Sequence, residues 1–201
     1  MTDEAVDRLI ASLEESPVID KSGYSYFVHP LSDGIPEISL ELLEDTAESL
    51  TKLLPPLSDF DLILTAEAMG IPIATIISLD TGKPFSIARK RRYDLPGEVS
   101  SGQVTGYSKN ELYLNLPREG GSLVIVDDVL STGGTLKALK NAIDRTSWEI
   151  VSAVVLFNKM ADATPDLEEI LGFPIVSLLD VIKSGEGFTA EVSSSARSLN
   201  V

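Results

Sequence analysis

Apolar residues recur at every third or fourth position in several stretches of the chain, which is the spacing of amphipathic helices. These stretches predict amphipathic helices over residues 3–15, 40–54 and 136–143. Pro55-Pro56 closes the second helix, because proline lacks the backbone N–H that a helix interior needs. A further helix is expected over residues 70–79, after the apolar strand over residues 61–65.

Short apolar runs lie between these helices and predict strands. The predicted strands cover residues 24–28, 61–65, 85–89, 112–115, 123–126, 150–157 and 175–179. Strands that alternate with helices are typical of the α/β class. We therefore expect a mainly parallel central sheet flanked by helices, within a single domain over residues 1–201.

Residues 90–110 depart from both patterns. They show no apolar periodicity and contain Pro96, Gly97, Gly102 and Gly106. We predict a long loop or hairpin here. An irregular stretch of this size inside a compact domain is usually functional or mobile.

Composition narrows the class of protein. The 201 residues include no cysteine, which excludes a disulfide framework, thiolate zinc sites and a cysteine nucleophile. The 31 acidic and 16 basic residues give a net charge of −15, whereas a general nucleic-acid binder is basic. The first fifteen residues are acidic, unlike a targeting peptide, and no apolar run reaches the roughly 20 residues of a membrane helix. We expect a soluble cytoplasmic protein without nucleic-acid or membrane partners.

The candidate chemistry lies in the stretch from Leu123 to Thr135. Its apolar strand ends in two adjacent carboxylates, Asp127 and Asp128, here called the acid pair. The carboxyl ends of strands are where open α/β sheets hold ligands. The acid pair can hold sugar hydroxyls or hydrated Mg²⁺.

Small residues follow the acid pair and lead into a predicted helix. This phosphate loop (residues 131–135) consists of Ser131, Thr132, Gly133, Gly134 and Thr135. Glycines let the backbone approach an anion, hydroxyls add donors, and the helix start adds partial positive charge. A plain strand–turn–helix with a hydroxyl cap is the alternative, but it leaves the two consecutive acids unexplained. The chain lacks the P-loop and dinucleotide glycine motifs, so those phosphate-binding classes are disfavoured.

The run Val126-Asp-Asp-Val-Leu-Ser-Thr-Gly-Gly-Thr135 resembles the phosphoribosyl-pyrophosphate signature of the type I phosphoribosyltransferases. In that family the carboxylate pair holds the ribose hydroxyls and the following loop binds the 5-phosphate. The resemblance therefore implies the type I phosphoribosyltransferase fold, with phosphoribosyl pyrophosphate as substrate. It also implies Mg²⁺ as cofactor, held mainly through the substrate near Asp127 and Asp128.

Further matches cover most of the chain. Thr65-Ala-Glu-Ala-Met-Gly70 resembles the family's pyrophosphate loop, and Arg89 to Glu98 resembles the start of the mobile catalytic loop of the adenine-type branch. Residues 103–109 resemble the returning limb of that loop. The matches make Glu67, Ala68 and Met69 candidate substrate contacts. Arg89, Lys90, Tyr107 and Lys109 become candidate catalytic residues, the first two toward pyrophosphate and the last two over the bound substrate.

The N-terminal segment indicates which branch of the family the chain resembles. Tyr26-Phe-Val-His-Pro30 and Asp33-Gly-Ile-Pro36 are similar to the archaeal hypoxanthine/guanine phosphoribosyltransferase family, which uses an adenine-type scaffold. This resemblance implies a small hood (residues 1–37) over the base, a flexible loop over residues 90–110, and a homodimer. Phe27 and Val28 are candidates to sandwich the purine, although core packing explains an aromatic strand equally well. His29, the only histidine, is expected to be a structural hydrogen-bonding residue.

The sequence also departs from related enzymes. Gly106 stands where adenine-type enzymes carry a glutamate, and Ser131 stands where the mammalian-type enzymes carry an aspartate base. Met69 replaces an arginine of the pyrophosphate loop. Glu98 and Glu111 are the alternative groups for acid/base work.

The resemblance implies a purine-salvage enzyme. It would transfer the 5-phosphoribosyl group from phosphoribosyl pyrophosphate to hypoxanthine or guanine, giving IMP or GMP and pyrophosphate. Adenine or xanthine are alternative bases within the same class. A regulator that senses phosphoribosyl pyrophosphate without turnover is the alternative from another class, and Gly106 and Ser131 are its support.

Overall fold

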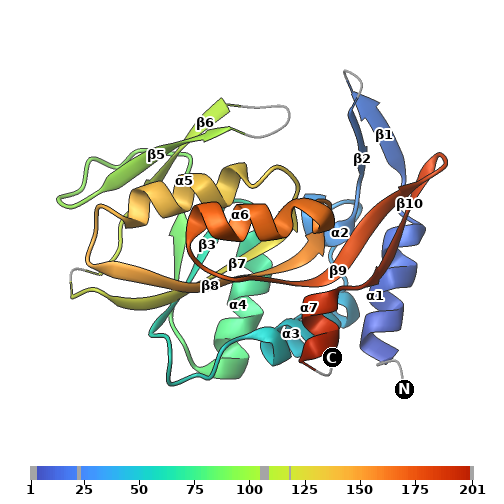
Figure 1. Ribbon diagram of the computed structural model, residues 1–201, viewed down its shortest axis with the longest axis horizontal. Coiled ribbons are helices and arrows are strands. Elements are labelled where there is room, and N and C mark those ends of the chain that lie inside the picture. Colours follow the sequence, from blue (N-terminus) through green and yellow to red (C-terminus); the bar gives the residue numbers. More distant parts are fainter. Residues whose placement is uncertain (1–3, 22–23, 105–108, 118, 200–201) are drawn as a thin grey trace.

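The computed structural model describes residues 4–21, 24–104, 109–117 and 119–199. Its centre is a six-stranded sheet in the order β10-β9-β8-β7-β3-β4 (Figure 1). The strands are β3 (Leu62–Ala66), β4 (Phe85–Ala88), β7 (Gly121–Leu130), β8 (Trp148–Asn158), β9 (Ile175–Ser184) and β10 (Gly187–Val192). All neighbours are parallel except β10, which pairs antiparallel with β9. The predicted α/β class with a mainly parallel sheet is confirmed.

Helices cover both faces of this sheet. Figure 1 shows α5 (Gly134–Ile143) and α6 (Thr164–Leu171) on one face, with α3 (Leu40–Leu53) and α4 (Gly70–Thr81) on the other. Because side chains of a strand alternate between faces, β7 serves two separate cores. Val124 and Val126 pack into the α3–α4 core, whereas Leu123 and Ile125 pack into the α5–α6 core. The continuous apolar run of β7 thus reflects burial on both sides.

Two small antiparallel hairpins stand apart from the central sheet. One joins β1 (Val18–Lys21) and β2 (Tyr24–Phe27), and a short helix α2 (Pro30–Asp33) follows it. The other joins β5 (Val99–Val104) and β6 (Lys109–Leu114), within the region predicted as a loop or hairpin. A further one-turn helix, η1, covers Ala161–Ala163.

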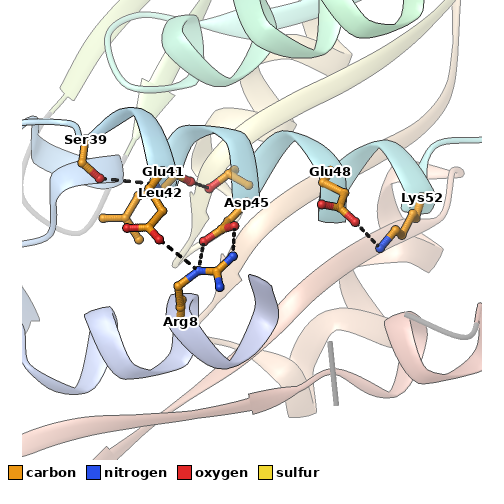
Figure 2. Close-up of polar contacts among 8 residues, drawn as sticks. Arg8, Ser39, Glu41, Leu42, Asp45, Glu48 and Lys52 are labelled. Atoms are coloured by element: carbon orange, nitrogen blue, oxygen red, sulfur yellow. Dashed lines mark hydrogen bonds and ion pairs between the residues drawn. The ribbon is translucent and has the colours of Figure 1, made fainter. Parts of the chain in front are cut away.

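The N-terminal helix α1 (Glu4–Glu14) is fixed to α3 by a partly buried contact (Figure 2). Arg8 donates from Nε and Nη2 to the two carboxylate oxygens of Asp45, at 2.8 and 2.6 Å. These hydrogen bonds raise the pKa of Arg8 above its ordinary value. Ser39 caps α3 by accepting from Leu42 N at 3.2 Å. The start of the hood is therefore anchored on the body of the molecule.

The predicted end of one strand was wrong, and two elements near the C-terminus were not predicted. The prediction ended the strand of the acid pair at residue 126, but β7 continues to Leu130, because pairing with β8 extends past the acids. The polar segment at the C-terminus contains the helix α7 (Ser194–Ser198), capped by Ser193, with Ala196 fully buried. The antiparallel strand β10 was not predicted either. Across the described residues, no helix is long and apolar enough to cross a membrane.

Candidate active site

The acid pair lies near the carboxyl end of β7, between β3 and β8. Only 7% of Asp127 is exposed. Burial raises the pKa of Asp127 to about 6 and raises the pKa of Asp128 well above its ordinary value. A hydrogen bond between the two carboxyls favours the ionised form of Asp127 and the protonated form of Asp128. The acid pair therefore binds a proton more readily in the free protein than two exposed carboxylates would.

Two charged residues from other segments act on the acid pair. The positive charge of Lys90 lowers the pKa of Asp127, which opposes the effect of burial. The carboxylate of Asp33, at the end of α2, raises the pKa of Asp128. The hood motif Asp33-Gly-Ile-Pro36 contains Asp33, but the sequence does not identify it as a residue of the site. Its contribution depends on the approach of α2 to β7, which spacing along the chain does not reveal.

The phosphate loop lines a pocket at the start of α5. The pocket is bounded by Asp127, Val129, Leu130, Leu136, Val155 and all five residues 131–135. Gly133 has φ 69°, and a Cβ there would lie 2.7 Å from the Leu167 side chain, so only glycine suits this position. Thr132 Oγ1 accepts from Gly134 N at 3.4 Å. The structure thus brings Asp127 of the acid pair and the phosphate loop to one pocket at a helix N-terminus, a suitable place for an anion.

The pyrophosphate loop (residues 65–70) lies next to the acid pair. A Cβ on Gly70, the first residue of α4, would lie 2.0 Å from Thr65 Oγ1 and 3.1 Å from Asp127 Oδ1. Among the described residues, the buried Thr65 hydroxyl has no hydrogen-bond partner. Glycine at position 70 therefore allows α4 to begin directly against β3 and the acid pair. The sequence motif marks residues 65–70, but this close approach appears only in the fold.

The central residues of the pyrophosphate loop have different surroundings. Glu67 contacts Arg89 and the backbone of Lys90. The peptide bond between Glu67 and Ala68 is cis. Met69 lies toward the hood, with its Cε 3.7 Å from the position of a Cβ on Gly34. The loop thus connects the hood to the segment that carries the candidate cations.

Hydrogen bonds to the Glu98 side chain hold the segment from Arg89 to Glu98 in place. Glu98 accepts from the backbone of Tyr93 and Asp94 and from Asn115 Nδ2, at 3.0, 3.2 and 2.8 Å. The bond from Asn115 is the main reason that the pKa of Glu98 is lowered.

Glu111 has a similar structural role. It accepts from Ser100 Oγ and Tyr113 Oη, both at 2.7 Å, which lowers its pKa. A base that is held ionised by several donors is a weak proton acceptor. The structure therefore argues against Glu98 and Glu111 as the acid/base groups. Tyr107 lies outside the described residues, and Lys109 begins β6.

Phe27 of the hood packs into the core of the protein. Phe27 is 4% exposed, and its ring packs edge-on against Phe157 and Phe188 at 5.5 and 5.4 Å. A ring enclosed in this way offers no face to a purine, so the core-packing alternative holds for Phe27. Val28 is half-buried, and its N–H donates to Pro17 O at 2.8 Å.

His29 is structural, as predicted. It is fully buried and accepts from Leu31 N at 3.1 Å, while its Nε2 lies 3.0 Å from Ser12 Oγ. Burial lowers the pKa of His29 to about 4, against the opposing charge of Asp33. The neutral ring thus caps α2 and orients the segment that brings Asp33 toward the acid pair.

The site's donors suit Mg²⁺ held through a substrate. Among residues whose placement is described, no group of three or more histidine, aspartate or glutamate side chains could hold a metal ion alone. The acid pair offers hard carboxylate oxygens beside the phosphate loop. Mg²⁺ usually takes one or two carboxylates and completes its shell with substrate phosphates and water. Asp127 and Asp128 fit that pattern.

Comparison with known proteins agrees with the resemblance of residues 126–135. The family model described as "Phosphoribosyl transferase domain" matches residues 56–191. The hypoxanthine/guanine phosphoribosyltransferase of Methanosphaerula palustris is 46% identical over 162 residues, covering 81% of this chain and 87% of the relative. The HGPRTase-like protein 2 of Haloarcula marismortui is 46% identical over 176 residues, covering 88% and 92%.

A solved structure supports the fold. The adenine phosphoribosyltransferase of Trypanosoma brucei matches with a TM-score of 0.72 at 18% identity, covering 89% of this chain and 80% of that chain. At this identity the likeness concerns the fold alone. Together with the extent of the family match and the identity to the archaeal relatives, it leads to one conclusion: the chain belongs to the phosphoribosyl transferase domain family.

Proposed function

We propose that the protein is a purine-salvage phosphoribosyltransferase that acts on hypoxanthine or guanine. It transfers the 5-phosphoribosyl group from phosphoribosyl pyrophosphate and releases IMP or GMP with pyrophosphate. The observation that carries this proposal is the single pocket shared by Asp127 and the phosphate loop, at the carboxyl end of a central strand. The names of relatives that are 46% identical over most of the chain support the choice of base.

The pocket suggests how the substrate would be held. The 5-phosphate would accept hydrogen bonds from the phosphate loop at the start of α5, and the acid pair would accept from the ribose hydroxyls. The pyrophosphate group would lie toward Glu67, Ala68, Met69, Arg89 and Lys90. A purine nitrogen then bonds to C1 of the ribose as the bond from C1 to pyrophosphate breaks, and the nitrogen loses its proton. The bonding electrons leave with pyrophosphate.

Charge explains how this chain would favour the reaction. Positive charge develops on the sugar as pyrophosphate leaves, and the nearby acid pair stabilises it when ionised. Mg²⁺, when bound, would neutralise the leaving pyrophosphate. Asp127 and Asp128 would hold it with the substrate in their ionised form. Lys90 favours ionisation of Asp127, because its charge lowers the pKa of that carboxyl.

The proposal also covers the hood, the loop over residues 90–110, the oligomeric state and the location of the protein. The hood covers the base, and residues 90–110, including Tyr107 and Lys109, close over the bound substrate and exclude water. The family resemblance supports a homodimer, and the archaeal relatives support an archaeal cytoplasmic protein. Light scattering of the purified protein, compared with the 21.6 kDa chain, tests the dimer directly.

The first experiment is a turnover assay. Phosphoribosyl pyrophosphate and Mg²⁺ are offered with hypoxanthine, guanine, xanthine or adenine, at low and at molar salt. We expect IMP or GMP from the first two bases. Product from adenine or xanthine alone would correct the base. Tight binding of phosphoribosyl pyrophosphate without product would favour the regulator, and no binding would overturn the assignment of the pocket.

A further inference from the structure

Glu67 contacts two consecutive residues of the segment that follows β4. Its Oε1 accepts from Lys90 N at 2.6 Å, and its Oε2 lies 2.7 Å from Arg89 Nε. The carboxylate side chain is 18% exposed and that of Arg89 is 41% exposed. One carboxylate from the pyrophosphate loop thus accepts a hydrogen bond from Lys90 N and forms an ion pair with Arg89 Nε, which has no hydrogen-bond partner among the described residues.

The path of the backbone does not depend on this contact. Arg89 N donates to Tyr113 O at 2.9 Å, and Tyr113 N donates to Arg89 O at 2.7 Å. Glu67 N donates to Ala88 O at 3.0 Å, which continues the pairing of β3 with β4. Because the main chain is already fixed on both sides, the Glu67 carboxylate is not needed to hold these segments together.

The contact has the chemistry of an anion-binding position. A guanidinium and a neighbouring backbone N–H bind carboxylate and phosphate oxygens in the same way. The charge of the Lys90 side chain also acts on Asp127, whose pKa it lowers. A pyrophosphate group placed beside the acid pair would therefore meet a position where a carboxylate of the chain already lies.

We infer that Glu67 is a positioning residue that serves as a resident anion in the position formed by Arg89 Nε and the Lys90 N–H. Its carboxylate lies against both groups in the free protein and leaves them when the pyrophosphate group binds, which also gives the Arg89 Nε–H an acceptor. The inference rests on the proposed function, because it requires pyrophosphate to bind at this loop. Since like charges repel, the displaced carboxylate weakens pyrophosphate binding and hastens release of the product.

The experiment compares Glu67→Gln with the wild type. Glutamine keeps the shape and can still accept from Lys90 N, but it lacks the charge. We measure the affinity for inorganic pyrophosphate by calorimetry, with and without Mg²⁺, and the steady-state kcat and KM for phosphoribosyl pyrophosphate. Glu48→Gln is the charge-matched control, because Glu48 pairs with Lys52 on the exposed side of α3 (Figure 2).

Glu67→Gln should bind pyrophosphate about fivefold tighter and show a lower KM with a lower kcat, while Glu48→Gln matches the wild type. Unchanged or weaker pyrophosphate binding by a folded Glu67→Gln protein would overturn the inference. If that variant does not fold, Glu67→Asp tests the same point, because the shorter side chain draws the charge away from Arg89. It should also bind pyrophosphate tighter than the wild type, and no tightening would overturn the inference. Wild-type protein that binds no pyrophosphate would instead overturn the proposed site.

Discussion

The segment from β7 to α5 and the hood use their distinctive residues in opposite ways. In the first, two carboxylates interrupt an apolar strand that is buried on both sides, and Asp127 lines the pocket with the phosphate loop. In the hood, Phe27 and His29 are buried in packing and capping contacts. A charged group costs free energy when it is buried, so its presence in a core strand points to function. Burial of an aromatic ring in a strand stabilises the fold, so such a ring does not by itself indicate a functional site.

The largest effect is expected from Phe27→Ala in the hood. Loss of the ring from its contacts with Phe157 and Phe188 should lower the free energy of unfolding by about 3–5 kcal/mol. Urea unfolding measures the loss, and Val28→Ala, at a half-buried neighbour, should cost much less. A Phe27→Ala protein that keeps its stability but has a raised KM for the purine would indicate that Phe27 contacts the base.

The acid pair should make stability depend on pH in the opposite sense to an ordinary ion pair. Burial raises the pKa of Asp127 from 3.8 to about 6, so the folded protein binds the proton more tightly than the unfolded chain. This contribution to stability is present below about pH 4 and is lost as the pH rises through about 6. Asp127→Asn should therefore exceed the wild type by about 2–3 kcal/mol at pH 8, with little difference at pH 4. Equal pH profiles from thermal unfolding would contradict the burial of an ionisable group there.

Asp128→Asn should lower turnover at least about tenfold, near 1.4 kcal/mol, because the amide cannot replace an ionised ribose ligand. The protein should remain folded, since the pKa of Asp128 is raised and its neutral form already suits the free site. Steady-state kinetics beside a thermal melt separate the two effects. Near-normal turnover would remove Asp128 from the reaction.

Two glycines with similar φ angles allow the phosphate loop to be compared with the end of α6, which lies outside the pocket. Gly133 and Gly172 have φ 69° and 77°, but only Gly133 has a side chain, that of Leu167, within reach of a Cβ. Alanine at either position should cost about 1 kcal/mol of stability from the backbone alone. Gly133→Ala should cost more and also weaken binding of ribose 5-phosphate, measured by calorimetry. Equal effects of the two variants on that binding would argue against a role of the phosphate loop.

Local patterns were sufficient to predict the order of most elements and the acid pair with its loop. The end of β7 was not predictable, because the strand continues through Asp127 and Asp128 only by pairing with β8. α7 was missed because its residues are polar, and its position depends on Ser193 and the burial of Ala196. Such features arise from contacts between distant segments.

The same limit applies within the site. The matches pointed to Glu67, Arg89 and Lys90 as separate candidates, but their contact requires the crossover from β3 to β4. The fit of Gly70 against Thr65 and Asp127 also depends on that packing. Residue types indicated which chemistry to expect, and the fold determined which groups meet.

A crystal structure with phosphoribosyl pyrophosphate and Mg²⁺ would show directly whether β7 and the phosphate loop form the substrate site. We expect the 5-phosphate on the backbone N–H groups of residues 132–135 and the ribose hydroxyls on Asp127 and Asp128. We expect the pyrophosphate group beside Glu67 and Arg89. Substrate bound elsewhere, with the phosphate loop empty, would contradict this assignment.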